Sequence, residues 1–182
     1  MTPKCSVFIA TSLDGFIARK DGALDWLPGS DGQTGGEDYG FGAFFESIDT
    51  LVIGRNTYEL ALTFPEWPYQ GKRVVVLSSR YPATLTPLGE GISGASAAPR
   101  DLLRQLALAG AQHIYVDGGK TIQGFLAAGL IQEMTITRVP VLLGEGIPLF
   151  GPLARDLLLH HLETQSFDNG LVQSRYRVGN AG

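Results

Sequence analysis

The chain has 182 residues, of which 44% are hydrophobic and 18% charged, and its formal net charge is −4. Such a composition is typical of a folded globular chain and argues against disorder. The acidic balance also argues against nucleic acid and an anionic membrane surface as partners, because neither attracts a negatively charged protein.

Cysteine content and hydropathy bear on location. Cys5 is the single cysteine, so no disulfide can form within the chain. No run of about 18 apolar residues predicts a transmembrane helix, and polar Thr11, Ser12 and Asp14 interrupt the first apolar run too early for a signal-peptide core. We therefore expect a cytoplasmic protein that forms one domain over residues 1–182.

The chain begins with a predicted buried strand at Cys5–Ala10, and the short apolar piece Phe16–Ala18 follows between two Asp-Gly turns. The segment Gly29–Gly36 is rich in Gly, Ser, Asp and Thr, which predicts a mobile loop. Three phenylalanines and an isoleucine at helical spacing then predict a helix over about Glu37–Ser47.

The middle of the chain predicts a strand at Thr50–Ile53 and a helix at Arg55–Leu62, which the proline-containing stretch Phe64–Pro68 ends. A strongly β-prone run follows at Arg73–Ser78. The stretch Pro82–Gly94 reads as loop with room for one short strand.

A helix is expected at Pro99–Ala109, with proline in its first turn, where it is tolerated. A strand at His113–Val116 and a helix at Thr121–Ala127 come next, and Gly129 ends that helix. Glu133–Leu143 alternates as a strand does.

Two β-like runs close the chain, Leu157–Phe167 and Leu171–Val178, around an Asn-Gly pair that favours a hairpin. Strands that alternate with helices indicate a parallel sheet, which needs helices on both faces. The sequence therefore predicts a three-layer α/β/α sheet, mostly parallel, with an antiparallel C-terminal hairpin.

Two strand-to-helix turns carry the strongest functional signal. In Ile114–Thr121 an apolar strand runs into two adjacent glycines and then a helix, and Leu51–Thr57 repeats the arrangement. Glycine lets the backbone approach a ligand closely, and the N–H groups of a helix start favour a phosphate. Either turn alone is an ordinary tight turn, but together they predict a nucleotide cofactor across one sheet.

With this layout the chain resembles the dihydrofolate reductase-like superfamily, and most closely the reductase domain of the riboflavin-biosynthesis deaminase-reductase. The matching segments are spread over nearly the whole chain in the family's order, and they are Val7–Ala18, Val52–Glu59, Val76–Arg80, Ile114–Lys120 and Pro140–Phe150.

The resemblance implies NADPH as the cofactor, bound across the sheet edge. Ala10, Ile17 and Ala18 would lie at the nicotinamide carboxamide, and Gly54, Arg55 and Thr57 would lie under the phosphates. The adenosine ribose and its 2′-phosphate would meet Ser78, Ser79 and Arg80. The pyrophosphate would be held by Gly118, Gly119, Lys120 and Thr121. Backbone N–H groups, hydroxyls and guanidinium groups are suitable phosphate partners.

The resemblance also points to two residues near the reacting atoms. Trp26 matches the tryptophan of a loop over the nicotinamide, and Asp38 matches a carboxylate on the first helix that faces the substrate. Beside aromatic rings this carboxyl would be partly desolvated, which would raise its pKa and suit proton delivery. Alternatively, Asp38 is a helix-start residue that interacts with the helix dipole.

The resemblance implies hydride transfer to a small heterocycle, as in 5-amino-6-(5-phosphoribosylamino)uracil reductase. The chain lacks the zinc-deaminase signature, and its three histidines predict no metal site. A folate or pterin reductase is an alternative within the same class, and a non-catalytic NADPH-binding module is an alternative of another class. Apolar terminal strands at a sheet edge further predict a homodimer.

Overall fold

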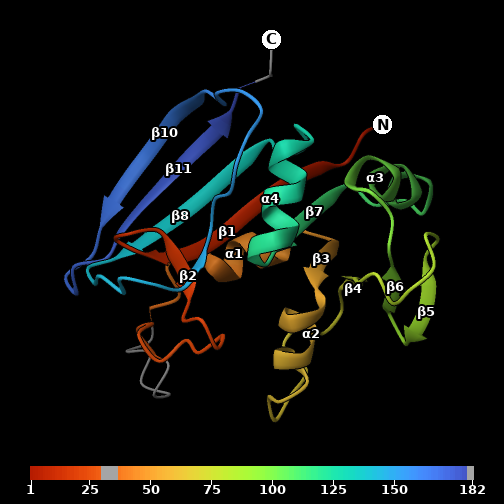
Figure 1. The fold of residues 1–182 in the computed structure, drawn as a ribbon, viewed down its shortest axis with the longest axis horizontal. Coiled ribbons are helices and arrows are strands. Elements are labelled where there is room, and N and C mark those ends of the chain that lie inside the picture. Colours follow the sequence, from red (N-terminus) through yellow and green to blue (C-terminus); the bar gives the residue numbers. More distant parts are fainter. Residues whose placement is uncertain (30–36, 180–182) are drawn as a thin grey trace.

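A computed structural model gives the structure of this chain and describes residues 1–29 and 37–179 (Figure 1). The strands are β1 (Lys4–Ser12), β2 (Phe16–Ala18), β3 (Thr50–Gly54), β4 (Arg73–Leu77), β5 (Thr86–Gly89), β6 (Ile92–Ala95), β7 (His113–Asp117), β8 (Glu133–Val139), β9 (Ile147–Pro148), β10 (Leu159–Ser166) and β11 (Val172–Val178). The helices are α1 (Phe41–Ser47), α2 (Arg55–Ala61), α3 (Pro99–Leu108) and α4 (Gly119–Ala127). The predicted loop over 29–36 lies, apart from Gly29, outside the described residues.

Within the described residues, nine strands form one sheet in the order β10-β11-β8-β1-β7-β3-β4-β6-β5. The strands from β8 to β6 in this order run parallel. At one edge β11 pairs antiparallel with β8 and β10 pairs antiparallel with β11, and at the other edge β5 pairs antiparallel with β6. The predicted fold class, a mostly parallel sheet with an antiparallel C-terminal hairpin, is confirmed. The stretch Pro82–Gly94 contains more structure than expected, because most of it forms the β5–β6 hairpin.

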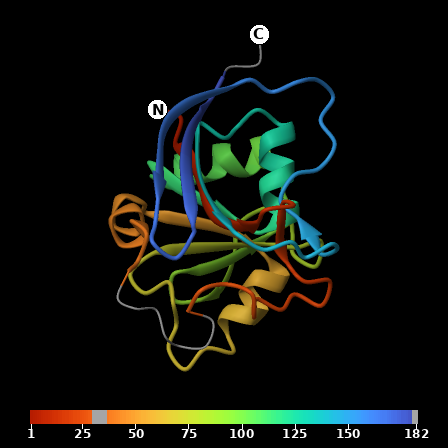
Figure 2. The same cartoon turned by 90° about the vertical axis from the view of Figure 1, so that its left-hand side faces the viewer.

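Two apolar clusters lie on opposite faces of the sheet, and Figure 2 shows α1 on one side of it and α3 and α4 on the other. The larger cluster packs Leu102 and Leu106 of α3 and Phe125 of α4 on one face. The other cluster packs Phe44 of α1 and Tyr58 of α2 on the second face. The sheet is thus buried on both sides, as a parallel sheet requires.

Two element boundaries differ from the prediction for local backbone reasons. Helix α1 begins at Phe41 rather than near Glu37, because Tyr39 and Gly40 have positive φ angles of 55° and 82° and cannot continue a right-handed helix. Strand β8 ends at Val139 rather than Leu143, where Pro140 follows and lacks the N–H that a ladder needs.

Cys5 is fully buried in the larger cluster, and burial raises the pKa of its thiol to about 12. Among the described residues, no helix is long and apolar enough to cross a membrane.

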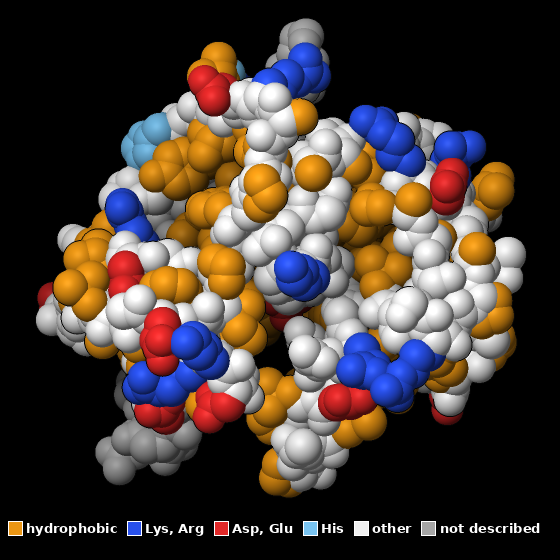
Figure 3. All heavy atoms as spheres, in the orientation of Figure 1, with side chains coloured by type: hydrophobic (Ala, Val, Ile, Leu, Met, Phe, Trp, Pro, Cys, Tyr) orange, Lys and Arg blue, Asp and Glu red, His pale blue; other side chains and the backbone are white. Residues whose placement is uncertain are grey.

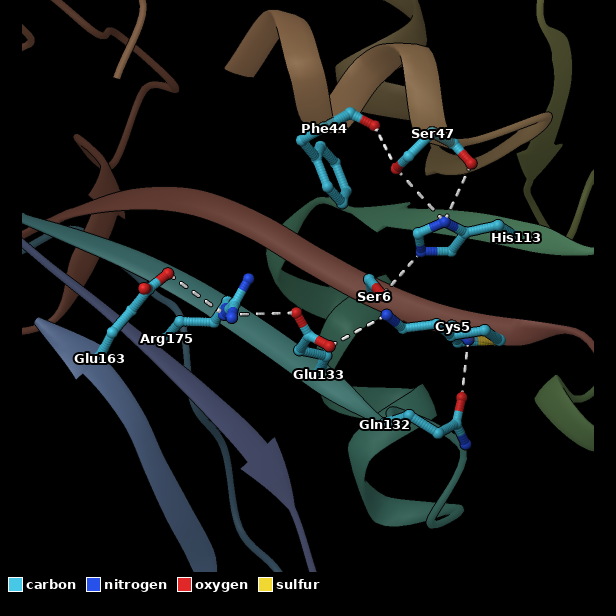
Figure 4. Close-up of polar contacts among 10 residues, drawn as sticks. Cys5, Ser6, Phe44, Ser47, His113, Gln132, Glu133, Glu163 and Arg175 are labelled. Carbon is cyan, nitrogen blue, oxygen red and sulfur yellow. Dashed lines mark hydrogen bonds and ion pairs between the residues drawn. The ribbon is translucent and has the colours of Figure 1, made fainter. Parts of the chain in front are cut away.

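His113 connects α1 to the sheet at the end opposite the two glycine turns (Figure 4). Its Nε2 lies 2.9 Å from the Ser6 hydroxyl, and its Nδ1 lies 3.1 Å from the Ser47 carbonyl oxygen. Partial burial lowers the pKa of the imidazole, and Lys4 nearby contributes in the same direction. The Ser47 carbonyl and the acids Asp49 and Glu133 oppose this shift without cancelling it.

When the pH falls from 7.5 to 5.5, we expect the free energy of unfolding to decrease less in the His113→Gln variant than in the native chain. A histidine whose pKa is lower in the folded state binds its proton more readily when unfolded, so acid favours unfolding below an ordinary pKa of about 6.5. Urea unfolding at both pH values measures the difference, and the other titrating groups are the same in the two proteins. Equal acid sensitivity in both proteins would contradict the assignment.

Candidate functional site

The carboxyl ends of β7, β3 and β4 meet at one edge of the sheet. The register pairs Ile53 with Asp117 and Gly54 with Leu77, so the three turns that follow these strands lie side by side. Helix α4 leaves this edge toward the face of the larger cluster, and α2 leaves it toward the other face. Neighbouring strands whose helices diverge in this way form the crevice where open α/β sheets bind ligands.

The two glycine turns are in contact. Gly118 has a φ angle of 94°, and a Cβ atom on it would lie 3.0 Å from the Thr57 hydroxyl oxygen. A Cβ on Gly54 would lie 3.3 Å from the Thr121 hydroxyl oxygen. The structure therefore brings together four residues that the sequence assigns to phosphate binding, and it shows why two of them are glycine.

The short pair β2–β9 covers the start of α4. A Cβ on Gly119 would lie 3.2 Å from both the Ile17 side chain and the Pro148 carbonyl oxygen. Asp14 holds the flanking loops together, because its carboxylate accepts hydrogen bonds from the Ser12 hydroxyl at 2.6 Å and from the N–H groups of residues 144 and 143 at 2.8 Å and 3.1 Å. Ile17 thus lies against the start of α4, and its assignment to the cofactor stays a prediction.

The remaining predicted cofactor residues lie around this edge. Ala10 is near the end of β1, paired with Thr137 of β8, and Ala18 is buried at the end of β2. Ser78 follows β4 beside Gly54, and its hydroxyl accepts a hydrogen bond from the Arg80 N–H at 3.3 Å. Ser79 and Arg80 are exposed beyond it.

Basic residues accompany the turns. Lys120 is exposed in the first turn of α4, and Arg55, in the first turn of α2, forms an ion pair of 3.5 Å with Glu59. Figure 3 shows a hollow on this face between the start of α4, α2 and the β2 segment. Aspartate or glutamate atoms are visible in its wall, and lysine or arginine atoms surround it.

The structure contradicts the pKa expected for Asp38. The residue is exposed in the turn before α1, and its carboxylate accepts hydrogen bonds from the N–H groups of Gly40 at 2.9 Å and Gly42 at 3.0 Å. These bonds, the one from Gly40 foremost, lower the pKa of the carboxyl instead of raising it, because they stabilise its charged form. This geometry matches the alternative interpretation of Asp38 as a helix-start residue.

Trp26 is half-buried in the chain that follows β2. Its indole N–H is buried, and no hydrogen-bond acceptor reaches it within residues 1–29 and 37–179. Buried N–H groups normally have a partner, which can be protein, ordered water or a ligand. The assignment of Trp26 to the nicotinamide loop stays a prediction.

Asp117 is the acidic residue that the sequence reasoning did not assign. It ends β7 immediately before Gly118, and its carboxylate accepts a hydrogen bond from the Gly118 N–H at 2.9 Å. Burial among its neighbours raises the pKa of this carboxyl to about 6, although part of the residue remains accessible to solvent. A shifted acid at a crevice is typical of a functional site. The signal was present in the sequence, because a carboxyl directly precedes the two glycines.

Aromatic side chains of the smaller cluster pack on the face of the sheet that carries α1 and α2. Phe8 stacks on Phe44 of α1 at 5.0 Å between ring centroids, and Tyr115 meets Phe44 edge-on at 5.1 Å. On the α2 side, Tyr69 packs edge-on against Trp67 at 5.2 Å. Burial and the nearby Asp117 carboxyl both raise the pKa of Tyr69. Of these rings, Tyr69 and Tyr115 are the ones that interact with the Asp117 carboxyl.

Among the described residues, no group of three His, Cys, Asp or Glu side chains could hold a metal ion.

The fold is that of the dihydrofolate reductase-like proteins. The structure of dihydrofolate reductase from Enterococcus faecalis complexed with NADP(H) and RAB-propyl is similar, with a TM-score of 0.65 over 98% of each chain. At 18% identity this likeness shows the fold alone.

The RibD C-terminal domain model matches residues 3–173, and the chain belongs to that family. It is 34% identical to the uncharacterized protein YwjB of Bacillus subtilis, over 97% of this chain and 98% of that protein. It is also similar to the crystal structure of a putative riboflavin biosynthesis protein from Shewanella sp. PV-4, with 41% identity, a TM-score of 0.84, and 97% and 99% of the two chains covered. The resemblance seen in the sequence is confirmed, and family and fold relate the chain to reductases.

Proposed function

We propose that this protein is an NADPH-dependent reductase that transfers a hydride to a small heterocyclic substrate of the type reduced by 5-amino-6-(5-phosphoribosylamino)uracil reductase. The observation that carries the proposal is the contact between the Gly54 and Gly118 turns, with the Asp117 carboxyl directly beside it. Family membership supports the reaction class.

The residues at the crevice suit a dinucleotide. Backbone N–H groups at the starts of α2 and α4, together with the Thr57 and Thr121 hydroxyls, would hold phosphate oxygens in the space that the glycines leave. Arg80 and Ser79, exposed at the end of β4, would bind the 2′-phosphate. When bound, the reduced nicotinamide supplies a hydride, and the protein supplies position and charge.

Asp117 would supply the proton. Reduction of a C=N bond places a hydride on carbon and a proton on nitrogen, and a carboxyl with a pKa near 6 still carries a proton in part of the molecules at neutral pH. The Gly118 N–H then stabilises the carboxylate that remains.

A binding titration with NADPH and, in parallel, NADH tests the cofactor assignment. We expect NADPH to bind at least about tenfold more tightly, because only it carries the 2′-phosphate that Ser79 and Arg80 would meet. Calorimetry or nicotinamide fluorescence gives both dissociation constants, and Arg80→Gln should bring the two closer together. If neither nucleotide binds, the proposed function is wrong. Ribosylaminopyrimidines and dihydropterins are the first substrates to screen with the bound enzyme.

We further propose that the protein is a homodimer that pairs through β10. All eight residues of this edge strand are exposed, including Leu159 and Leu162. Light scattering at micromolar concentration should give about twice the 19.5 kDa of one chain. Leu162→Glu should reduce the mass to that of one chain, whereas Leu108→Glu on α3, whose side chain is also exposed, should not. A single-chain mass for the native protein would contradict the proposal.

A further inference from the structure

The paired strands β2 and β9 form a strap that lies over the start of α4. A Cβ atom on Gly119, the first residue of α4, would lie 3.2 Å from both the Ile17 side chain and the Pro148 carbonyl oxygen. One turn further along the helix, the side-chain amide of Gln123 donates a hydrogen bond of 3.1 Å to the same carbonyl oxygen. The strap is therefore attached to the helix whose first residues belong to a glycine turn.

Asp14 attaches the strap to the main sheet. Its carboxylate accepts hydrogen bonds from the Ser12 hydroxyl at 2.6 Å and from the N–H groups of Gly144 at 2.8 Å and Leu143 at 3.1 Å, in the loop that leads to β9. The Ser12 hydroxyl oxygen in turn accepts a hydrogen bond of 3.0 Å from the Phe16 N–H, at the start of β2. These bonds, the one from Ser12 foremost, lower the pKa of the Asp14 carboxyl, so it is charged at neutral pH. One carboxylate thus ties both strands of the strap to the end of β1.

The order of the strands indicates which part of a dinucleotide lies beside the strap. In the sheet β4, β3, β7 and β1 are neighbours in that order, and all four run parallel. Under the proposed function the 2′-phosphate lies at the end of β4, and the pyrophosphate lies at the turns after β3 and β7. The remainder of the nucleotide, which carries the nicotinamide, then extends toward the end of β1, and Asp14 follows that end. The strap and the 2′-phosphate residues Ser79 and Arg80 are therefore at opposite halves of the cofactor.

We propose that Asp14 is a positioning residue for the nicotinamide half of NADPH, because it holds the β2–β9 strap against the first residue of α4. This inference rests on the proposed function. Asp14 acts through the strap, which forms one wall of the place that the nicotinamide half occupies. The charge of Asp14 by itself works against binding, since a carboxylate repels a nucleotide that carries several negative charges. A loss of affinity on removal of this charge therefore reports position and not electrostatic attraction.

The test compares the binding of two ligands to Asp14→Asn by calorimetry. Asparagine keeps the shape of the side chain but has one acceptor oxygen where the carboxylate has two, so a bond to the strap is lost. NADPH contains both halves of the cofactor, whereas adenosine 2′,5′-bisphosphate contains only the half that carries the 2′-phosphate. We expect the affinity for NADPH to fall by about tenfold or more and that for the bisphosphate to change by less than about twofold. An equal loss for both ligands, as general destabilisation would cause, or no loss for NADPH would overturn the proposal.

Glu145→Gln is the matched control for charge. Glu145 follows Gly144 in the same loop, and its carboxylate forms an ion pair of 2.6 Å with Lys20, the second residue after β2. Both side chains are exposed, and an exposed ion pair contributes little to stability. The variant loses the same charge as Asp14→Asn, and we expect it to keep the native affinity for both ligands. A loss of NADPH affinity as large as that in Asp14→Asn would contradict the assignment to Asp14.

Gly146→Ala disturbs the strap through a different contact. A Cβ atom on Gly146 would meet the Ala18 carbonyl oxygen of β2 and would lie 3.2 Å from the Phe16 side chain, so β2 and β9 must move apart. This variant leaves the Asp14 carboxylate in place. We expect it to lose affinity for NADPH and to keep its affinity for the bisphosphate, as Asp14→Asn does. Native affinity for NADPH in this variant would contradict a role of the strap.

Amide hydrogen exchange, followed by NMR without any nucleotide, tests the strap itself. The Leu149 N–H, directly after β9, donates a hydrogen bond of 3.0 Å to the Gly15 carbonyl oxygen, so its exchange rate reports whether the two segments stay joined. In Asp14→Asn this N–H should exchange at least about tenfold faster, whereas the Leu130 N–H, which bonds to the Phe125 carbonyl oxygen after α4, should be unaffected. Unchanged exchange at Leu149 would overturn the role of Asp14. If the native protein binds neither ligand, the proposed function is wrong, and the exchange rates still decide whether Asp14 holds the strap.

Discussion

Asp117→Asn should lower the rate of substrate reduction by about 10²- to 10³-fold and, at pH 8, raise the free energy of unfolding by roughly 1–3 kcal/mol. The rate falls because an amide cannot give up a proton to the substrate nitrogen. Nucleotide binding should be retained, because the backbone N–H of Gly118 and the glycine turns are unchanged.

The gain in stability follows from the direction of the pKa shift. The Asp117 carboxyl has a pKa of about 6 in the folded chain and an ordinary value of 3.8, so the folded state binds the proton more tightly. Its contribution to stability is fully present below about pH 4 and is lost as the pH rises through 6. Asparagine has no proton to lose, so the stability of the variant should not show this decline. Denaturant unfolding of both proteins from pH 4 to 8 measures the decline in the native chain and its absence in the variant.

Asp38→Asn is the matched control. Asp38 is exposed and its pKa is lowered, so the substitution should leave the reduction rate nearly unchanged. Loss of turnover in Asp38→Asn together with normal turnover in Asp117→Asn would reverse the assignment of the acid.

Gly118→Ala should cost roughly 2–3 kcal/mol of stability and weaken NADPH binding by at least about tenfold. The backbone of Gly118, at φ 94° and ψ 140°, is one that residues with a Cβ rarely adopt. The added methyl group would also lie 3.0 Å from the Thr57 hydroxyl oxygen, inside the space assigned to the phosphates. Thermal unfolding and a nucleotide titration give the two effects.

Gly110→Ala separates backbone strain from binding. Gly110 also has a positive φ, of 84°, but it follows α3 and a Cβ there would meet no atom within 4 Å. This variant should lose roughly 1 kcal/mol of stability and keep its nucleotide affinity. Equal NADPH affinity in the Gly118 variant and the native chain would exclude this turn from the cofactor site.

The glycine turns could be predicted from the sequence because the signal is local. A strand, one or two glycines and a helix start occupy seven or eight consecutive residues, and the parallel sheet then places the end of β7 beside the end of β3. The β5–β6 hairpin was missed for the opposite reason. Its strands are only four residues long, and β6 owes its place to pairing with distant β4.

The raised pKa expected for Asp38 is wrong, because a carboxyl's pKa depends on what surrounds it. Asp38 and Asp117 are chemically identical in the sequence. The turn before α1 gives Asp38 two N–H donors and solvent, whereas the end of β7 places Asp117 among Tyr115 and Tyr69 from separate parts of the chain. Only the assembled sheet creates this difference.

The sequence by itself determined the order of strands and helices, the mostly parallel sheet, the two glycine turns and the family, because these depend on apolar periodicity and short-range backbone preferences. The tertiary structure decided which carboxyl has a raised pKa and which glycines have little room for a side chain. Those properties arise where Thr57 meets Gly118 and where Tyr69 meets Asp117, residues far apart in the chain that come together only when the strands pair.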